Sequence, residues 1–240
     1  MTNKKLAYII LILFCFSCKS NTEEKQNNTY SDVVSVAAMK DVMWKGELFS
    51  KIKLDTIKPK NGLYGLGPET YLRGEIVINN GKTYVSRVLT DSTMAVNEIS
   101  NAEAPFFVYA NVTEWSKIKL PSSVKSIKDL ESFIDNNTKS QKRPFVFKLD
   151  GRISAATIHI QNLPKGTKVS SPKEAHQGQI NYQLESEDVE IIGFFSTEHQ
   201  GIFTHHDSFL HMHLISKDKT KMGHLDDVAF NEMSLLLPKS

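Results

Sequence analysis

Cysteine is almost absent from this chain of 240 residues, which contains only Cys15 and Cys18. Both stand inside an apolar N-terminal stretch, where a redox-active Cys-x-x-Cys pair has no strand to follow. If that stretch is removed, the mature chain has no thiol and can form no disulfide. Packing, with or without a bound metal ion, must then stabilise the fold.

A large excess of charge of one sign is also missing. Lys and Arg together number 29 and Asp and Glu number 27, which gives a formal net charge of +2. This balance creates no electrostatic field that would gather nucleic acid, so we expect no polyanionic partner. The sequence shows no repeat at a fixed period. Hydrophobic residues make up 40% of the chain, which is enough for the core of one large domain or of two small lobes.

The N-terminal hydrophobic run is too short to cross a membrane. It extends from Leu6 to Phe16, whereas a membrane helix needs about 20 apolar residues. Lys4 and Lys5 precede it, and a charged start followed by a short apolar centre is typical of a secretory signal. We therefore predict a signal peptide at residues 1–17.

The predicted signal runs into the motif "CFSC", which resembles a bacterial lipobox and would make Cys18 the lipidated first residue of the mature protein. Plain secretion without a lipid is the alternative. The segment "KSNTEEKQNNTYS" that follows has almost no bulky apolar groups, so it cannot offset the entropy lost on ordering. We predict a lipidated tether at residues 18–31 and an exported envelope protein that touches the membrane only through its lipid.

For residues 32–240 the pattern predicts an α+β fold, with β-rich mixed or antiparallel sheets and a few helices. A first amphipathic helix is expected between Val33 and Glu47. A second is expected at "SIKDLESFIDNN", where Ser126 and Asp129 form a capping-box pattern. An apolar stripe indicates that this second helix packs on the core, and it consists of Ile127, Leu130, Phe133 and Ile134.

Short β-rich runs separated by turn residues fill most of the remaining chain. The strongest hairpin signal is Asn80-Gly81, which joins the two halves of "GEIVINNGKTYVSRVL". Further strands are expected in "RPFVFKLDG", "ATIHIQ", "INYQLES", "VEIIGFFS" and "FLHMHLIS".

Histidine is missing from the first half of the chain, and all 8 histidines lie between His159 and His224. In "HMH", His211 and His213 are two residues apart on an expected strand, so their side chains share one face with Cα atoms about 6.5 Å apart. The polar segment "ISKDKTKMG" suits a turn that returns His224 on a neighbouring strand. We predict a metal site of these three imidazoles; the alternative is that they face solvent and never meet.

Three imidazoles without a fourth protein ligand are typical of a catalytic zinc site, because a structural site is closed, often by cysteine. The mature chain has no cysteine to offer. His205 and His206, in "GIFTHHDSF", belong either to a loop that faces the substrate or to the surface, and we favour the surface. His176 and His199 lie in polar segments and are assigned no role.

Several segments in order resemble the bacterial α-acetolactate decarboxylase family over roughly residues 61–230: "GLYGLGPETYLRGEIVINNGKTYV", "APFFVYANV", "FKLDGRISAATIHIQ", "IIGFFSTEHQGI" and "HMH" followed by "GH". The resemblance implies that zinc binds His211, His213 and His224. It also implies that Glu75, in the family's "GE" pair, acts in the active site. From the residues alone, Glu75 could equally be an exposed charge at the start of a strand.

The same resemblance implies a substrate and a mechanism. The expected substrate is 2-acetolactate or another small 2-hydroxy-3-keto acid, and the product of acetolactate is acetoin. Zinc would stabilise an enediolate as carbon dioxide leaves, and Glu75, or a water that it orients, would deliver a proton.

Two departures from the family pattern bear on activity more than on fold. The family has an active-site arginine after the "DG" pair; here His159 falls near its position, and Arg152 lies too early to align. His159 could take over the handling of the substrate carboxylate. The family also uses a carboxylate from a C-terminal tail, and Glu232 does not match that motif.

Two other functions fit the sequence. A non-catalytic envelope lipoprotein could bind a small ligand on the same scaffold. A cupin-like metal-dependent oxygenase would also use "HMH" and a later histidine, but it would place a glutamate where this chain has Lys217 and Asp218. A homodimer is left open as the assembly.

Overall fold

A computed structural model describes residues 30–239 of the chain. The predicted signal peptide at residues 1–17 and the lipid attachment at Cys18 lie outside the described residues, as does most of the predicted tether. The described end of that tether lies against the folded domain. Tyr30 forms a bridge to Val112, and the backbone N–H of Ser31 donates to the carbonyl of Asn111 at 2.8 Å.

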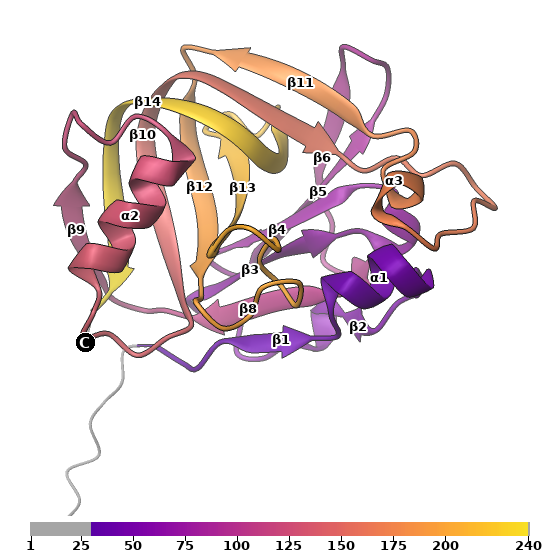
Figure 1. Ribbon diagram of the computed structural model, residues 1–240, viewed down its shortest axis with the longest axis horizontal. Coiled ribbons are helices and arrows are strands. Elements are labelled where there is room, and N and C mark those ends of the chain that lie inside the picture. Colours follow the sequence, from indigo (N-terminus) through magenta and orange to yellow (C-terminus); the bar gives the residue numbers. More distant parts are fainter. Residues whose placement is uncertain (1–29, 240) are drawn as a thin grey trace, which may run out of the picture.

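The domain contains two six-stranded sheets (Figure 1), and all of their strand pairs are antiparallel. The first sheet has the order β1 (Val34–Val36), β8 (Phe107–Asn111), β3 (Leu63–Pro68), β4 (Glu75–Asn79), β5 (Lys82–Val88) and β6 (Met94–Glu98). The second has the order β11 (Ile180–Glu185), β10 (Phe145–Ile160), β12 (Asp188–Phe195), β13 (Leu210–Ser216), β14 (Met222–Pro238) and β9 (Trp115–Lys119). The predicted α+β, sheet-rich class is confirmed.

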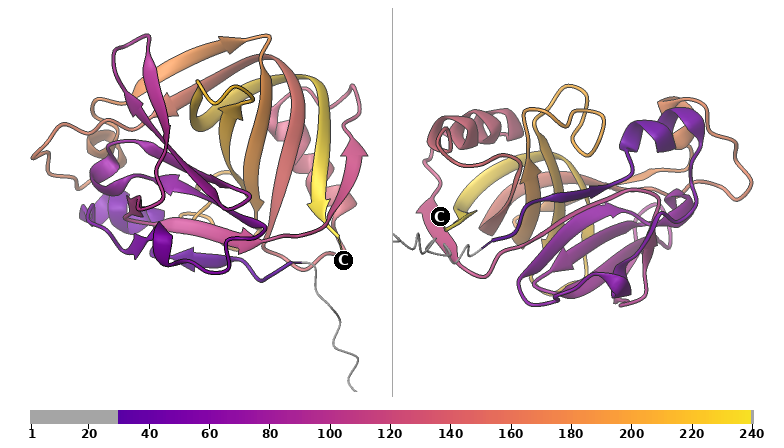
Figure 2. Two further views of the ribbon diagram at one scale, coloured as in Figure 1. Left: turned by 180° about the vertical axis from the view of Figure 1, so that it is seen from behind. Right: turned by 90° about the horizontal axis from the view of Figure 1, so that it is seen from below.

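Smaller elements complete the described part of the chain. They are the paired strands β2 (Ile52–Lys53) and β7 (Glu103–Ala104), the helices α1 (Met39–Lys45), α2 (Ile127–Asn137) and α3 (Pro172–Ala175), and two short 3-10 turns, Leu54–Thr56 and Thr70–Leu72. The helices α1 and α2 lie at opposite ends of the molecule (Figure 2).

Four strands of the second sheet close on themselves. β10 pairs with β12, β12 with β13 and β13 with β14, and β14 pairs again with β10. β10 can serve both neighbours because it is long: the expected strands "RPFVFKLDG" and "ATIHIQ" are one continuous strand. This closure places His213 opposite His224 across one strand pair and His159 opposite His224 across another.

Helix α2 forms as its sequence predicts. The hydroxyl of Ser126 accepts from the backbone N–H of Asp129, and the carboxylate of Asp129 accepts from the backbone N–H of Ser126. This capping box satisfies N–H groups that the first turn of a helix leaves unpaired. Leu130 and Ile134 are completely buried in the core of the second sheet, so the apolar stripe packs inward as expected.

The first predicted helix is largely wrong. The β-branched residues Val34 and Val36 lie in β1, which pairs with β8, and Ala37 then adopts a left-handed conformation with φ 57° that no helix continues through. Only Met39–Lys45 is helical, and Gly46 ends it in the left-handed conformation. The sheet edge therefore overrides a weak amphipathic pattern.

The hairpin at Asn80-Gly81 is confirmed. Both residues have positive φ, 49° and 83°, as a two-residue turn of this kind requires, and they join β4 to β5. Glycine suits the second position because a side chain there would be strained. The turn fixes the register of β4 and so the position of Glu75 at its first residue.

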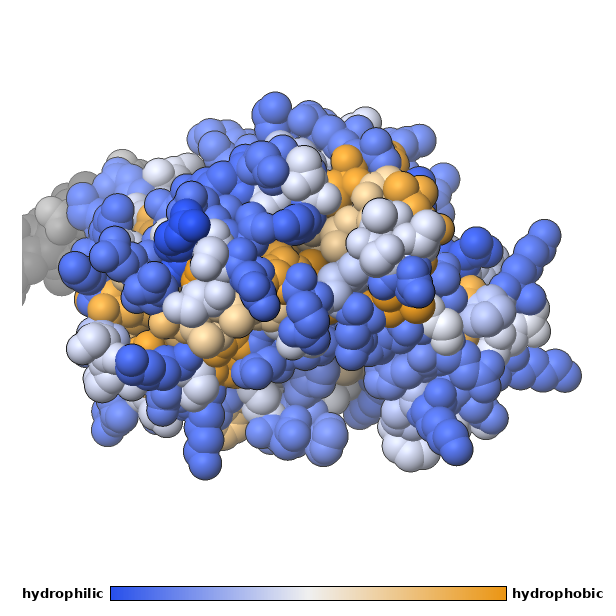
Figure 3. All heavy atoms as spheres, turned by 90° about the horizontal axis from the view of Figure 1, so that it is seen from above, coloured by the Kyte–Doolittle hydropathy of each residue, from blue (hydrophilic) through white to orange (hydrophobic). Residues whose placement is uncertain are grey.

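Side chains from both sheets share one core. Its central members are Leu66, Val77 and Val108 from the first sheet and Val146, Ile192 and Phe194 from the second. On the face shown in Figure 3, hydrophobic side chains appear only in interrupted patches between hydrophilic ones. None of the helices in residues 30–239 has the length and apolar character needed to span a membrane.

Candidate metal centre

Three histidines meet where β13 and β14 run side by side. The ring centroids of His211 and His213 are 5.1 Å apart, those of His211 and His224 are 5.2 Å apart, and those of His213 and His224 are 5.4 Å apart. All three residues are buried. The alternative in which these histidines face solvent and never meet is therefore wrong.

Burial keeps these imidazoles neutral. It lowers the pKa of His211 and His213 well below the ordinary 6.5, and the neighbouring imidazoles add to the effect. Burial, followed by the nearby His159, lowers the pKa of His224 to about 4. A neutral imidazole has a free lone pair and is the form that binds a metal ion.

Several ring nitrogens in this cluster have no partner. Nδ1 of His211 and both ring nitrogens of His213 are buried and make no hydrogen bond of ordinary geometry within residues 30–239, although the backbone of Phe203 and of Ile76 lies close enough to act on the pKa of these two rings. A buried polar atom without a partner is costly, by about 1–3 kcal/mol. A divalent cation held by nitrogen ligands would satisfy such atoms, so the residues present fit one.

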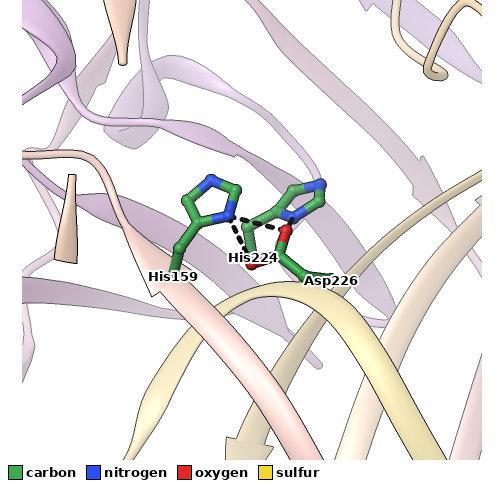
Figure 4. Close-up of side chains that lie close together, drawn as sticks. All are labelled: His159, His224 and Asp226. Atoms are coloured by element: carbon green, nitrogen blue, oxygen red, sulfur yellow. Dashed lines mark hydrogen bonds and ion pairs between the residues drawn. The ribbon is translucent and has the colours of Figure 1, made fainter. Parts of the chain in front are cut away.

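A carboxylate lies on the other side of His224. Oδ1 of Asp226 is 3.2 Å from Nδ1 of His224, and the two oxygens of Asp226 are 2.7 and 2.8 Å from Nδ1 of His159 (Figure 4). The remaining nitrogen of each ring points away from the carboxylate. Burial alone would raise the pKa of Asp226, but these two hydrogen bonds outweigh it, and the pKa falls below its ordinary value. Asp226 is therefore an anion that receives an N–H from each ring.

A break in the register between β10 and β14 places Asp226 beside His159 and His224. Thr157 pairs with Asp227 and Ile158 with Leu225, so Asp226 is an extra residue that bulges out of the β10–β14 ladder. Next to it, Gly223 lets β14 approach β10 closely, because a Cβ at that position would lie 2.5 Å from the carbonyl oxygen of His159. The bulge and the glycine together bring His159, His224 and Asp226 into contact, with ligating atoms within 4.8 Å of one another.

Glu75 approaches the cluster from the first sheet. It is 2% exposed, and its Oε2 lies 3.7 Å from Nε2 of His213. Its Oε1 accepts a hydrogen bond of 3.2 Å from the backbone N–H of Gln161. Burial raises the pKa of Glu75 well above 4.5, and the negative charges of Asp226 and Glu69 add to it. The alternative of an exposed charge is wrong, because Glu75 is buried and its pKa is raised, which favours the protonated form.

These groups surround a cavity of about 230 Å³. Glu75, His159, His211 and His224 form its polar wall, and His213 lies directly behind them. The lining also has apolar members, which are Met39, Met43 and Trp44 from α1 with Leu72 and Phe106. The cavity suits a small molecule that has both oxygen atoms and alkyl groups.

The other four histidines, His176, His199, His205 and His206, lie in different surroundings. His206 is on the surface, with a side chain 89% exposed, as expected. The surface prediction is wrong for His205, whose Nε2 lies 2.9 Å from Nε2 of His224, because the loop after β12 folds back over the cluster. His176 lines the cavity, and His199 binds Ser196 and stacks on Phe203 away from it.

Arg152 and Glu232, which were compared with the family's active-site arginine and tail carboxylate, do not reach the site. Arg152 lies on β10 and pairs with Asp188 at the surface, and Glu232 lies exposed on β14 opposite Arg152. The sequence did not indicate Asp226 or the apolar lining residues, and it left a substrate-facing His205 as the less favoured alternative. Asp226 stands two residues after His224, which on a regular strand would suggest a shared face, but the sequence does not reveal the bulge.

The chain resembles known proteins along nearly all of the described domain. The family model for alpha-acetolactate decarboxylase matches residues 33–239. An alpha-acetolactate decarboxylase of Methanosarcina mazei is 24% identical over 217 residues, which cover 87% of this chain and 72% of the relative.

Two crystal structures share the fold. The alpha-acetolactate decarboxylase of Bacillus subtilis strain 168 superimposes with a TM-score of 0.71 at 22% identity, covering 88% of this chain and 86% of the other. A Staphylococcus aureus protein of unknown function, described as similar to alpha-acetolactate decarboxylase, gives a TM-score of 0.73 at 16% identity, covering 85% and 84%.

Proposed function

Because the chain belongs to the alpha-acetolactate decarboxylase family, we propose that it decarboxylates 2-acetolactate, or a closely related 2-hydroxy-3-keto acid, and that it needs zinc to do so. Acetolactate would yield acetoin and carbon dioxide. One observation supports this most: three buried imidazoles, from His211, His213 and His224, meet beside a cavity that is also lined by Glu75, a carboxyl group whose pKa is raised by burial.

We assign His211, His213 and His224 as the zinc ligands, since their rings converge and burial lowers the pKa of each, which favours the uncharged form that binds nitrogen-preferring cations. When bound, zinc supplies a Lewis acid that polarises the keto and hydroxyl oxygens of the substrate and stabilises the negative charge left behind as carbon dioxide departs. The absence of a cysteine among the described residues is consistent with an open, catalytic type of site.

Glu75 has the role of proton donor in this proposal. Burial raises the pKa of its carboxyl group, which favours the protonated form, and the group lines the cavity. The bond from Gln161 fixes one oxygen, which leaves the other free to face the substrate. The proton passes to the carbon that carried the carboxylate, directly or through one water molecule, and Glu75 then regains a proton from solvent.

His159 and the apolar lining residues orient the substrate. Asp226 holds Nδ1 of His159, so its other ring nitrogen is available to hydrogen-bond the substrate carboxylate when that nitrogen carries a proton. This contact takes the place of the family's arginine. Methyl groups of the substrate pack on Met43 and Phe106, which removes water from the site of carbanion formation.

The test is acetoin release. Purified protein is analysed for bound metal, stripped with a chelator, reloaded with zinc and incubated with racemic 2-acetolactate. We expect acetoin from the zinc-loaded protein and not from the stripped protein, and no acetoin or bound zinc with His213→Ala. His206→Ala, which removes an exposed histidine of the cavity lining, should still bind zinc like the unmodified protein. Release no greater than in the stripped control would refute the activity, and iron instead of zinc would refute the metal assignment.

A further inference from the structure

A fourth histidine stands at the proposed zinc site. His205 lies in the loop between β12 and β13, and its ring centroid is 4.9 Å from that of His224 and 6.1 Å from that of His211. The spacing from His224 is similar to the spacings among His211, His213 and His224 themselves. The ring of His205 thus joins the cluster instead of lying beside it on the surface.

The distance between the ring nitrogens of His205 and His224 can be compared with the spacing of two ligands on one zinc ion. Nε2 of His205 is 2.9 Å from Nε2 of His224. In a tetrahedral zinc site with Zn–N bonds of about 2.0–2.1 Å, two ligand nitrogens are about 3.3 Å apart. His205 therefore holds its nitrogen near the place where a fourth ligand, or a substrate oxygen, would bind.

The loop that carries His205 is anchored to the rest of the domain on both sides of this residue. On one side, Thr204 is buried and hydrogen-bonded to the loop backbone at Gly201 and His199. On the other, the carboxylate of Glu131 accepts from the hydroxyl of Ser208 at 2.6 Å and from the N–H of Phe209 at 2.7 Å. Between these anchors, residues 206–207 form a turn, and their side chains are exposed.

There is space for the ring to move. The His205–His224 contact separates the substrate cavity from a second cavity of about 280 Å³, and both histidines line both cavities. The second cavity is bounded by Ile127, Asp207 and Met212. His205 can therefore withdraw from the cluster without unfolding the loop anchors.

We propose that His205 is a displaceable fourth zinc ligand, which closes the resting site and gives up its position when the substrate binds. This rests on the proposed zinc site of His211, His213 and His224. No proton changes hands, because the neutral imidazole leaves with its lone pair and a substrate oxygen replaces it. The consequence is a site that holds its ion firmly between turnovers and opens only to a molecule that can supply an oxygen ligand.

Zinc binding without substrate tests the ligand role. His205→Ala and His205→Gln are compared with His206→Ala by competition with a chromogenic chelator. We expect both His205 variants to bind zinc at least about tenfold more weakly, and His206→Ala to match the unmodified protein. Circular dichroism checks that each variant is folded. Unchanged affinity in the His205 variants overturns the proposal and leaves His205 as a hydrogen-bond partner of His224 alone.

Cobalt in place of zinc tests displacement, because its visible absorption depends on the number and kind of its ligands. The unmodified protein and His205→Ala should differ when free of ligand, and they should converge when saturated with acetoin, the proposed product. Identical spectra without acetoin overturn the ligand role. Spectra that differ without acetoin and stay apart with it overturn the displacement. These measurements need no turnover, so a failure of the decarboxylase activity is detected separately by the acetoin assay.

Discussion

Two glutamates of this domain, one buried and one partly buried, have opposite surroundings. Glu190, on β12, receives hydrogen bonds of 2.7 Å from Lys148 and from Lys219. Burial alone would raise its pKa, but the two lysines outweigh it and bring the pKa down to about 2. Glu75 is more deeply buried and has no lysine or arginine partner among the described residues, so its pKa is raised.

The two side chains are therefore suited to different roles: Glu190 stabilises the fold, and Glu75 is suited to proton transfer. Where the fold supplies cations, the carboxylate is permanently charged and its bonds tie β12 to neighbouring segments. Where the fold buries a carboxyl group beside neutral imidazoles and an open cavity, the group retains a proton that it can give away. Replacement of each glutamate by glutamine should therefore give opposite results.

The largest effect is expected from Glu75→Gln. Glutamine has nearly the same shape but no transferable acid proton, so kcat for acetoin formation should fall about 10²- to 10⁴-fold. Zinc content should be unchanged, and the free energy of unfolding should not decrease. Rates are measured by acetoin release and stability by urea denaturation. A variant with full activity would show that Glu75 does not supply the proton.

An intermediate effect is expected from Asp226→Asn. Asp226 orients His224 and His159 through their Nδ1 atoms, and loss of such a supporting carboxylate typically weakens metal binding about 10- to 100-fold. Chelator competition measures the affinity. Asp227→Asn is the matched control, because Asp227 is the neighbouring aspartate, is likewise exposed, and within residues 30–239 accepts a hydrogen bond from the backbone N–H of Val228 instead of from a histidine. Equal zinc affinity in the two variants would remove Asp226 from the site.

The smallest effect on activity, and the clearest on stability, is expected from Glu190→Gln. Acetoin formation should stay the same, while the free energy of unfolding at pH 7 should fall by about 2 kcal/mol as charge-assisted hydrogen bonds are lost. Glu98→Gln, which breaks the exposed pair with Lys82, should cost less than about 0.5 kcal/mol. Loss of acetoin formation in Glu190→Gln would erase the distinction between the two carboxylates.

The loss of stability in Glu190→Gln should depend on pH. The pKa of Glu190 is about 2 in the folded protein and 4.5 ordinarily, so its stabilising effect is fully present above pH 4.5 and is lost as the pH falls towards 2. The difference in unfolding free energy between the unmodified protein and Glu190→Gln should therefore shrink across that interval. Urea denaturation at a series of pH values measures it, and a constant difference would contradict the assignment.

Local sequence patterns predicted the parts of the fold that depend on near neighbours. The capping box of Ser126 and Asp129 and the turn at Asn80-Gly81 are both present, since each is a property of a few consecutive residues. The pattern between Val33 and Glu47 misled, because Val34 and Val36 pair with β8, a strand far along the chain: Val36 lies opposite Phe107, 71 positions later.

In the candidate site, too, the sequence predicted what depends on near neighbours and missed what depends on distant segments. The spacing of His211, His213 and His224 predicted their meeting, because alternation along a strand and a short turn are sufficient to bring them together. No spacing predicted Asp226 or His205. A bulge between two strands turned the first inward, and a loop anchored on a distant helix residue, Glu131, folded the second over the cluster.

The sequence by itself determined the strands, the hairpin turns and the histidines that alternate on one of those strands, since these depend on side-chain chemistry and backbone preference within a short segment. Only the tertiary structure decided which carboxyl groups are charged. That outcome depends on burial and on the cations within a few ångströms, and lysines reach Glu190 while none reaches Glu75.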